Sequence, residues 1–207
     1  MTKAALLESY GQPDDKESGI SSLVIKAKEG SRGAFNLLIG LFHEDIFRMV
    51  YYRIRSRMDS EDLTQDIFIQ AFKNIAQLKT IAHFKSWLYR IAINRVRDFY
   101  RKKRLRSLIG LFSENEGIDV NDIYDSGKNN PDPLENEIRK DFWHQFEIAL
   151  ECLSRMEKEV FLLRFLDQLG IKEISQALFK SESTVKTHLY RALVKLRKNA
   201  ALQNFFN

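Results

Sequence analysis

The chain has 207 residues, of which 44% are hydrophobic and 12% aromatic, so it can form one folded domain or two small ones. Nine glycines and three prolines favour helices over a turn-rich β architecture, and a single cysteine excludes an intramolecular disulfide and a cysteine-rich zinc site. The net charge of +5 is unevenly distributed: residues 79–106 and 180–198 are basic, whereas residues 113–137 are acidic. Two basic blocks predict two surfaces for a polyanion, although solvated helix faces are an alternative.

The acidic stretch also carries the strongest loop signals, Gly117, Gly127 and the sequence NNPDP, and Gly110 lies just before it. Apolar periodicity disappears within this stretch. We therefore predict a mobile leader over residues 1–20, a helical domain over 21–106, a linker over 107–138 and a second helical domain over 139–200. No apolar stretch approaches the about 18 residues that a membrane span needs. Acidic residues interrupt any signal-peptide core, so we expect a soluble, cytoplasmic protein.

The first domain is predicted to contain four helices and no strand, because no segment alternates at period two for long enough. Ser21 is expected to cap a short helix that Gly30 ends, and a second helix is expected from about Ala34 to Arg55. Ser60 is expected to cap the third helix, and the fourth is expected over residues 84–104. The fold class is all-α.

The third helix has two distinct faces. Its predicted core residues are Leu63, Ile67, Ala71, Ile75 and Leu78. The opposite face carries Asp62, Gln65, Asp66, Ile69 and Lys73. An isoleucine in the middle of a polar face indicates a partner surface, and a solvated face with one stray apolar residue is the alternative.

The fourth helix interleaves aromatic and apolar side chains with cations and an amide. Aromatic rings stack on unpaired bases while cations follow the phosphates, so this mixture is typical of binding to single-stranded nucleic acid. Each residue also has a structural interpretation: Trp87 as a partly buried core residue, His83 as polar surface, and the basic end of the helix as a solubilising segment.

The C-terminal half begins with a capping box, Ser154 to Glu157, at the start of a helix that is predicted to end at Gly170. Its expected buried residues are Val160, Phe161, Leu163 and Leu166. Residues 171–178, a turn at 179–181 and residues 182–198 then predict a helix-turn-helix, because two helices are separated by three residues. The expected inward residues of the last helix are Val185, Leu189, Leu193 and Leu196.

The second helix of such a motif lies in the DNA major groove and presents its N-terminal residues to base edges. The residues at that end are Ser183, Thr184, Lys186, Thr187 and His188. Further along, Arg191 and Lys195 suit contacts with phosphates, while a plain helical hairpin is the alternative interpretation.

Three stretches together resemble a known family. Residues 60–68 (SEDLTQDIF) and 84–94 (FKSWLYRIAIN) resemble the sigma-2 domain of extracytoplasmic-function, group IV, bacterial sigma factors. Glu173 and Ile174 with residues 183–192 (STVKTHLYRA) resemble their sigma-4 domain. The resemblance implies a factor that directs core RNA polymerase to specific promoters and helps to open them, without an enzymatic activity, a cofactor or a metal.

By that resemblance, Asp62, Gln65, Asp66 and Ile69 correspond to the patch that binds the clamp helices of the polymerase β′ subunit. The residues that correspond to contacts with the −10 element are Lys79, Thr80, His83, Phe84, Trp87, Arg90, Asn94, Arg97 and Arg101. The helix over 183–195 corresponds to the reader of the −35 element. The implied partners are core polymerase, including its β flap, promoter DNA and an anti-sigma factor, and the implied regulon is stress- or envelope-related.

The sequence departs from the family pattern at Phe179, where a glycine is common, and in its longer leader. Two other functions stay open at this point. An ordinary helix-turn-helix regulator would bind promoter duplex tightly without polymerase. A sigma-like decoy would bind polymerase or a regulator and never open DNA.

Overall fold

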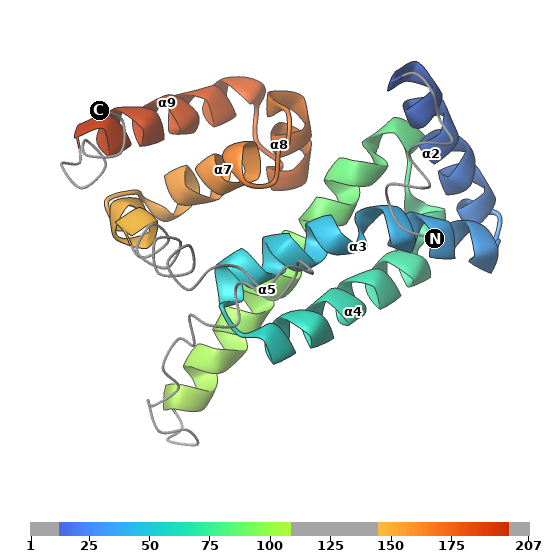
Figure 1. The fold of residues 1–207 in the computed structure, drawn as a ribbon, viewed down its shortest axis with the longest axis horizontal. Helices are drawn as coiled ribbons and strands as arrows, with labels where there is room; N and C mark the ends of the chain where they lie inside the picture. The colour runs from blue at the N-terminus through green and yellow to red at the C-terminus, as the bar shows by residue number, and fades with distance from the viewer. Residues whose placement is uncertain (1–12, 109–144, 199–207) are drawn as a thin grey trace, which may run out of the picture. The chain divides into compact units, whose positions relative to one another are not determined.

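The computed structural model describes residues 13–108 and 145–198, which are helical apart from short connections and contain no strand (Figure 1). The chain divides into two compact units, residues 1–118 and 119–207. The all-α class and the two helical domains are therefore confirmed. Most of the predicted linker, the first 12 residues and the last nine lie outside the described part of the chain.

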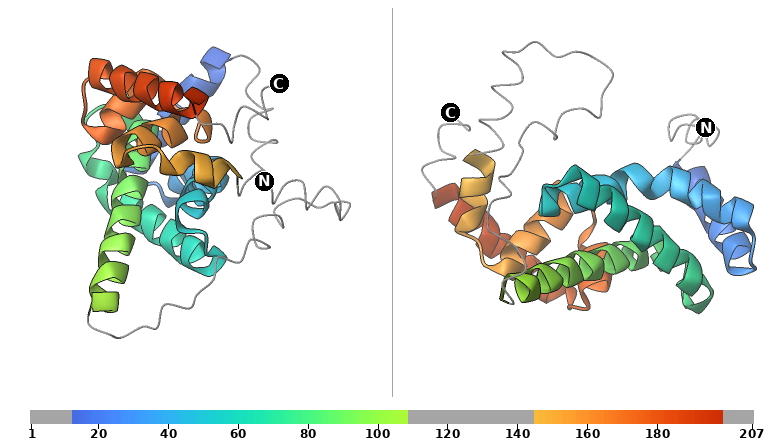
Figure 2. Two further views of the ribbon diagram at one scale, coloured as in Figure 1. Left: turned by 90° about the vertical axis from the view of Figure 1, so that its left-hand side faces the viewer. Right: turned by 90° about the horizontal axis from the view of Figure 1, so that it is seen from below.

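The first unit contains α2 (Pro13–Lys28), α3 (Arg32–Ile54), α4 (Arg57–Asn74) and α5 (Phe84–Leu108), with the short 3-10 turns η1 (Ile75–Gln77) and η2 (Ile81–His83). Helix α3 packs against all three other helices, so its apolar face forms the centre of the core. Val24, Ile46, Ile67 and Leu88 are all fully buried there. The C-terminal turns of α5 extend past α3 and α4 (Figures 1 and 2).

Two predicted helix starts are wrong. Helix α2 begins at Pro13 rather than at Ser21, so residues 13–20 are helical. A proline has a fixed φ and lacks the amide hydrogen that the first turn leaves unbonded, so it suits a helix start. Helix α4 is capped by Ser56, whose hydroxyl accepts a 3.4 Å bond from the Asp59 amide, and Ser60 is a buried residue of its first turns.

The cap lies at Ser56 because the chain leaves α3 through Arg55 in the left-handed conformation, with φ of 61°, and re-enters helical geometry immediately afterwards. The Ser60 hydroxyl donates to the Ser56 carbonyl over 2.6 Å instead of capping the helix. Helix α5 starts at Phe84, as predicted, and continues to Leu108, four residues beyond the expected end at Arg104.

The second unit contains a helical segment over residues 145–151, α7 (Arg155–Phe165), α8 (Ile171–Leu178) and α9 (Glu182–Lys198). Its core is formed where α9 packs against α7 and α8. The predicted capping box of α7 is confirmed: the Ser154 amide donates to Glu157 Oε2 over 2.8 Å, and the Glu157 amide donates to Ser154 Oγ over 3.4 Å.

The bounds of α8, the turn and α9 agree with the prediction, but the end of α7 does not. Helix α7 ends at Phe165, and Gly170 instead caps the start of α8, where its amide donates to Glu173 Oε2 over 2.7 Å. Leu193 was expected inside and is 41% exposed, because Ala192 rather than Leu193 continues the buried stripe of Val185 and Leu196.

Candidate functional site

The outer face of α4 is exposed along its length, with the core residues on the other side. Asp62, Gln65, Asp66, Ile69 and Lys73 are all exposed, whereas Ile67, Ala71, Ile75 and Leu78 are buried and Leu63 is half-buried. Ile69 exposes 45% of its surface at the centre of this face. Periodicity therefore assigned both faces correctly, apart from the incomplete burial of Leu63.

Two further apolar side chains lie on the exposed side of α4. Met58 is 74% exposed and Phe72 is 40% exposed, although the Phe72 ring also packs edge-on against Phe35 at 5.1 Å. In the part of the chain that the structure describes, Asp62 and Asp66 have no ion-pair partner. This face combines unpaired carboxylates with apolar surface, so it is complementary to a partner with basic and apolar groups.

The connection from α4 to α5 exposes the predicted residues Lys79 and Thr80, and His83 is half-buried. Its ends are held by backbone hydrogen bonds, from the Leu78 amide to the Ile75 carbonyl (3.0 Å) and from the His83 amide to the Thr80 carbonyl (3.1 Å). The two exposed residues therefore lie between fixed points, where their side chains are available to a ligand.

Along α5, five of the predicted contact residues lie on one stripe. At 100° per residue, Trp87, Arg90, Asn94, Arg97 and Arg101 fall within about 80° of one another. Asn94 and Arg101 are exposed and the other three are half-buried. Burial lowers the pKa of Arg90. Arg101 forms an exposed ion pair with Asp98 at 3.1 Å, and since such pairs contribute little, its guanidinium can exchange this partner for a phosphate.

Phe84 is not on this stripe, and its burial does not favour the predicted contact with DNA. Its side chain is 2% exposed and packs against the rings of Phe42 (5.5 Å) and Trp87 (5.9 Å). Phe84 and Leu88 are four residues apart and share the buried face of α5. Phe84 therefore supports the Trp87 ring from the core.

The N-terminal part of α9 exposes Ser183, Lys186 and Thr187, and Arg191 is exposed one turn later. Ser181, which the sequence interpretation did not single out, accepts a 3.2 Å hydrogen bond from the Thr184 amide and so caps this helix. Its hydroxyl also lies 2.8 Å from the Ser183 and Thr184 hydroxyls. The start of α9 is therefore an ordered hydroxyl cluster, whose signal in the sequence is a serine one residue before the helix.

Two predicted base-reading residues are restricted in how they can contact DNA. The Thr187 hydroxyl donates to the Ser183 carbonyl over 2.9 Å, so its oxygen remains an acceptor for a base edge. His188 is half-buried, and its Nδ1 is buried without a hydrogen-bond partner among the described residues. Contact between His188 and DNA must therefore use Nε2.

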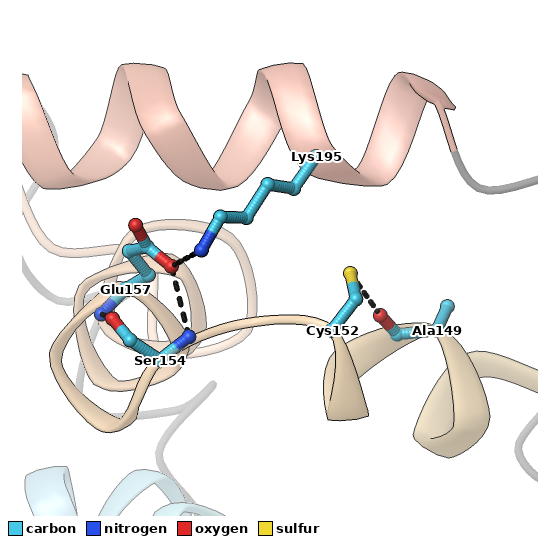
Figure 3. Close-up of polar contacts among 5 residues, drawn as sticks. All are labelled: Ala149, Cys152, Ser154, Glu157 and Lys195. Carbon is cyan, nitrogen blue, oxygen red and sulfur yellow. Dashed lines mark hydrogen bonds and ion pairs between the residues drawn. The ribbon is translucent and has the colours of Figure 1, made fainter.

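Lys195 has a different environment from the other basic residues of α9. Its Nζ lies 2.6 Å from Glu157 Oε2, and the same oxygen accepts the Ser154 amide at the start of α7 (Figure 3). The hydrogen bond from Lys195, followed by that from the Ser154 amide, lowers the pKa of Glu157 from 4.5 to about 2. Lys195 thus joins α9 to α7, and periodicity could not find its partner 38 residues away.

Comparison with known proteins decides the family. Residues 38–106 match Sigma-70 region 2, and residues 144–196 match Sigma-70 region 4, so the two matches together cover more than half of the chain. The protein is an extracytoplasmic-function sigma factor of the sigma-70 family. The sigma factor is consequently a non-enzymatic initiation factor, whose regions 2 and 4 bind RNA polymerase and promoter DNA.

Curated relatives align with most of the sigma factor. It is 28% identical over 187 residues to the ECF RNA polymerase sigma factor BldN of Streptomyces coelicolor, covering 89% of this chain and 67% of the relative. It is 32% identical over 148 residues to a probable RNA polymerase sigma factor of Haemophilus influenzae, covering 67% and 75%. It is 29% identical over 170 residues to SigX of Bacillus subtilis, covering 81% and 84%.

Solved structures share the fold of the sigma factor. CnrH, in complex with the cytosolic domain of CnrY, matches with a TM-score of 0.60 at 21% identity, covering 86% of this chain and 95% of that one. The sigma factor RpoE of Bartonella quintana, in complex with the anti-sigma factor NepR, matches with a TM-score of 0.59 at 19% identity, covering 82% and 96%. Within the described residues, every helix is too short or too polar to cross a membrane.

Proposed function

We propose that this sigma factor divides promoter recognition among three surfaces. The α4 face, defined by Asp62, Gln65, Asp66 and Ile69, binds the clamp helices of the polymerase β′ subunit. The α5 stripe, from Trp87 to Arg101, and the segment 78–83 capture the −10 element. The exposed N-terminal half of α9 reads the −35 element, while the β flap holds the second unit. The observation that carries this proposal is that each set presents exposed residues on the surface of its own unit, although Trp87, Arg90 and Arg97 of the α5 stripe are half-buried at the edge of the core.

The α5 stripe suits the energetic demands of promoter opening. Removing a base from the duplex costs a few kcal/mol, so contacts must exist that form only with the unpaired strand. The Trp87 ring, supported by Phe84, supplies a stacking surface, and the arginines of the stripe neutralise phosphates. Because this surface contains many cations, its affinity for DNA falls steeply with salt concentration.

We further propose that an anti-sigma factor restrains the protein by competing with polymerase for the α4 face. Two sigma factors of similar fold were solved in complexes, one with the cytosolic domain of CnrY and the other with the anti-sigma factor NepR. Unpaired carboxylates beside the half-exposed Ile69 form a surface that a partner can cover. Since polymerase is its target, the protein acts in the cytoplasm, and its regulon is stress- or envelope-related.

Reconstitution with purified core polymerase tests the proposal. The wild-type protein is mixed with core enzyme and a library of random promoters, and run-off transcripts identify the promoters that it uses. The double variant Asp62→Ala, Ile69→Ala should keep the wild-type melting temperature and lose association with core polymerase, because both side chains are exposed. Glu44→Ala, an exposed change on α3, is the matched control and should behave as wild type.

Each alternative function predicts a different result. Tight, sequence-specific binding of duplex by the free protein, unchanged by polymerase, would identify an ordinary helix-turn-helix regulator. Binding to core polymerase without transcripts from any promoter would identify a decoy. Retained polymerase affinity in the folded double variant would contradict the assignment of the α4 face.

A further inference from the structure

Helix α2 is joined to the segment 78–83 by a hydrogen bond that spans 50 residues of sequence. The Lys28 ammonium donates to the Leu78 carbonyl over 2.6 Å, and both groups are partly buried. Helix α2 also packs against η1 and η2, the two short turns on either side of the exposed residues Lys79 and Thr80. The segment proposed to receive an unstacked base therefore has its first residue held by α2.

The backbone around Lys28 is held in place by the turn that ends its helix. Immediately after it the chain turns at Gly30, whose φ of 97° is the left-handed conformation that favours glycine. Hydrogen bonds from the Gly30 amide to the Ala27 carbonyl (3.1 Å) and from the Ser31 amide to the Lys26 carbonyl (3.0 Å) fix the turn into α3. Lys28 therefore projects from a rigid corner, with Leu23, Val24 and Ala27 buried on the same helix.

Leu78 is fixed through each of its groups. Its side chain is 4% exposed, its amide donates to the Ile75 carbonyl over 3.0 Å, and its carbonyl accepts the Lys28 ammonium. With φ of −65° and ψ of 113°, the residue is extended and directs the following two residues out of the core. Of the two hydrogen bonds that Leu78 makes, the one from Lys28 comes from outside the α4–α5 connection.

We propose that Lys28 is a positioning residue for promoter opening, and that it holds the segment 78–83 in the conformation that captures an unpaired −10 base. This inference rests on the proposed function of that segment. Helix α2 lies before the part of the chain that matches Sigma-70 region 2, which begins at residue 38, so the family match assigns it no role. In this protein α2 acts on the melted strand indirectly, through one charge-assisted hydrogen bond.

The test compares Lys28→Met with Lys26→Met in the full-length protein. Methionine keeps an unbranched side chain and removes the ammonium, and Lys26 is an exposed lysine two residues earlier on the same helix. Each variant is assembled with core polymerase on a promoter selected by the wild-type holoenzyme. Transcription is measured from that promoter as intact duplex and as a template with a pre-melted −10 region.

Lys28→Met should lower the ratio of duplex to pre-melted transcription by about tenfold, which is the scale of one hydrogen bond to a charged group. Amide hydrogen exchange should become faster at Leu78 and His83, and the affinity for core polymerase should not change. Lys28→Arg, which retains a charged donor, should restore part of the ratio. Lys26→Met should leave the ratio and the exchange rates at their wild-type values.

A purely structural role makes a different prediction. If Lys28→Met leaves the ratio of duplex to pre-melted transcription unchanged, whether transcription from both templates falls equally or not at all, the positioning role is overturned. The same result for Lys28→Met and Lys26→Met would also overturn it. If Thr80→Ala combined with Lys79→Ala leaves the ratio at its wild-type value, the proposed function of the segment fails, independently of Lys28.

Discussion

The Glu157–Lys195 ion pair allows a stabilising role of Lys195 to be distinguished from a role in DNA binding. Glu157 is 4% exposed, and its carboxylate accepts both the Lys195 ammonium and the Ser154 amide. Replacing Lys195 by methionine removes the cation. Among the described residues, the buried Glu157 carboxylate then interacts only with the backbone amide and the hydroxyl of Ser154. Because the remaining charge is then incompletely compensated, we expect the second unit to be destabilised.

The magnitude follows from the pKa of Glu157, which the fold lowers from 4.5 to about 2. A shift of that size corresponds to about 3 kcal/mol at neutral pH if all of it contributes to stability. Lys195 contributes only part of the shift, and its side chain is 44% exposed and so screened by solvent. We therefore expect Lys195→Met to cost about 1–2 kcal/mol at pH 7.

The sign of the pH dependence is fixed by the direction of the shift. The folded protein holds Glu157 ionised more readily than the unfolded chain does, so the stabilisation is fully present above about pH 4.5 and is lost as pH falls towards 2. The stability difference between wild type and Lys195→Met should accordingly shrink over this range. Urea unfolding of the full chain, with peptide-resolved hydrogen exchange for α7 and α9, measures the difference at each pH.

The control is Lys198→Met, which removes an exposed cation from the same helix and should leave stability unchanged. A constant stability difference from pH 7 to pH 2.5 would refute the ion-pair argument. So would a Lys195→Met variant of wild-type stability whose promoter affinity is weaker and whose salt slope is reduced by about one, since that is the behaviour of a phosphate contact.

Ile67 is fully buried on α4, so Ile67→Ala should lower the free energy of unfolding by about 2–5 kcal/mol, as measured by denaturation. Phe179 is 75% exposed with φ of 53°, so Phe179→Gly should stabilise the second unit by about 1 kcal/mol, and an unchanged or lower melting temperature would contradict this. Arg191→Ala should weaken all −35 sequences equally and reduce the salt slope by about one. Thr187→Ala should instead change the preference at one base by about 1–3 kcal/mol in a −35 library.

Periodicity and capping residues were sufficient to predict most of the fold. The wheel of α4 separated Ile67 and Ala71 from Asp62 and Ile69, because one apolar face must be buried and the opposite face was polar. The bounds of α8 and α9 were also predictable, since the short turn at 179–181 interrupts two clear periodic stretches. These features depend on residues within a few positions of each other.

The errors arose where two local signals competed. Ser56 and Ser60 are both plausible caps by residue type, and only the left-handed exit of α3 at Arg55 decides between them. Phe84 and Trp87 are both aromatic residues at the start of a basic helix, and Phe84 is buried against Phe42 of α3 whereas Trp87 is half-buried beside it. Neither choice could be made without the tertiary contacts of α3.

Long-range polar contacts could not be predicted from local sequence patterns either, because they too depend on tertiary structure. A basic residue on a helix face looks the same in sequence whether its partner is a phosphate, as proposed for Arg191, or a buried carboxylate, as for Lys195. The contact of Lys28 was equally unpredictable, because its acceptor is the backbone carbonyl of Leu78, which every residue type carries. Contacts of this kind connect elements far apart in sequence, and the sequence pattern of neither partner changes when they form.

The three proposed surfaces differ in how closely they are coupled to the core. On α4 and on the N-terminal half of α9, contact residues such as Asp62 and Thr187 are exposed and lie opposite the buried stripe, so substitutions there should alter binding without unfolding the protein. On α5 the stripe contains the half-buried Trp87 and Arg90, which directly precede and follow the buried residues Leu88 and Tyr89. If the α5 stripe opens the promoter as proposed, promoter opening depends on the part of the protein where a change in the packing of the core directly moves the contact surface.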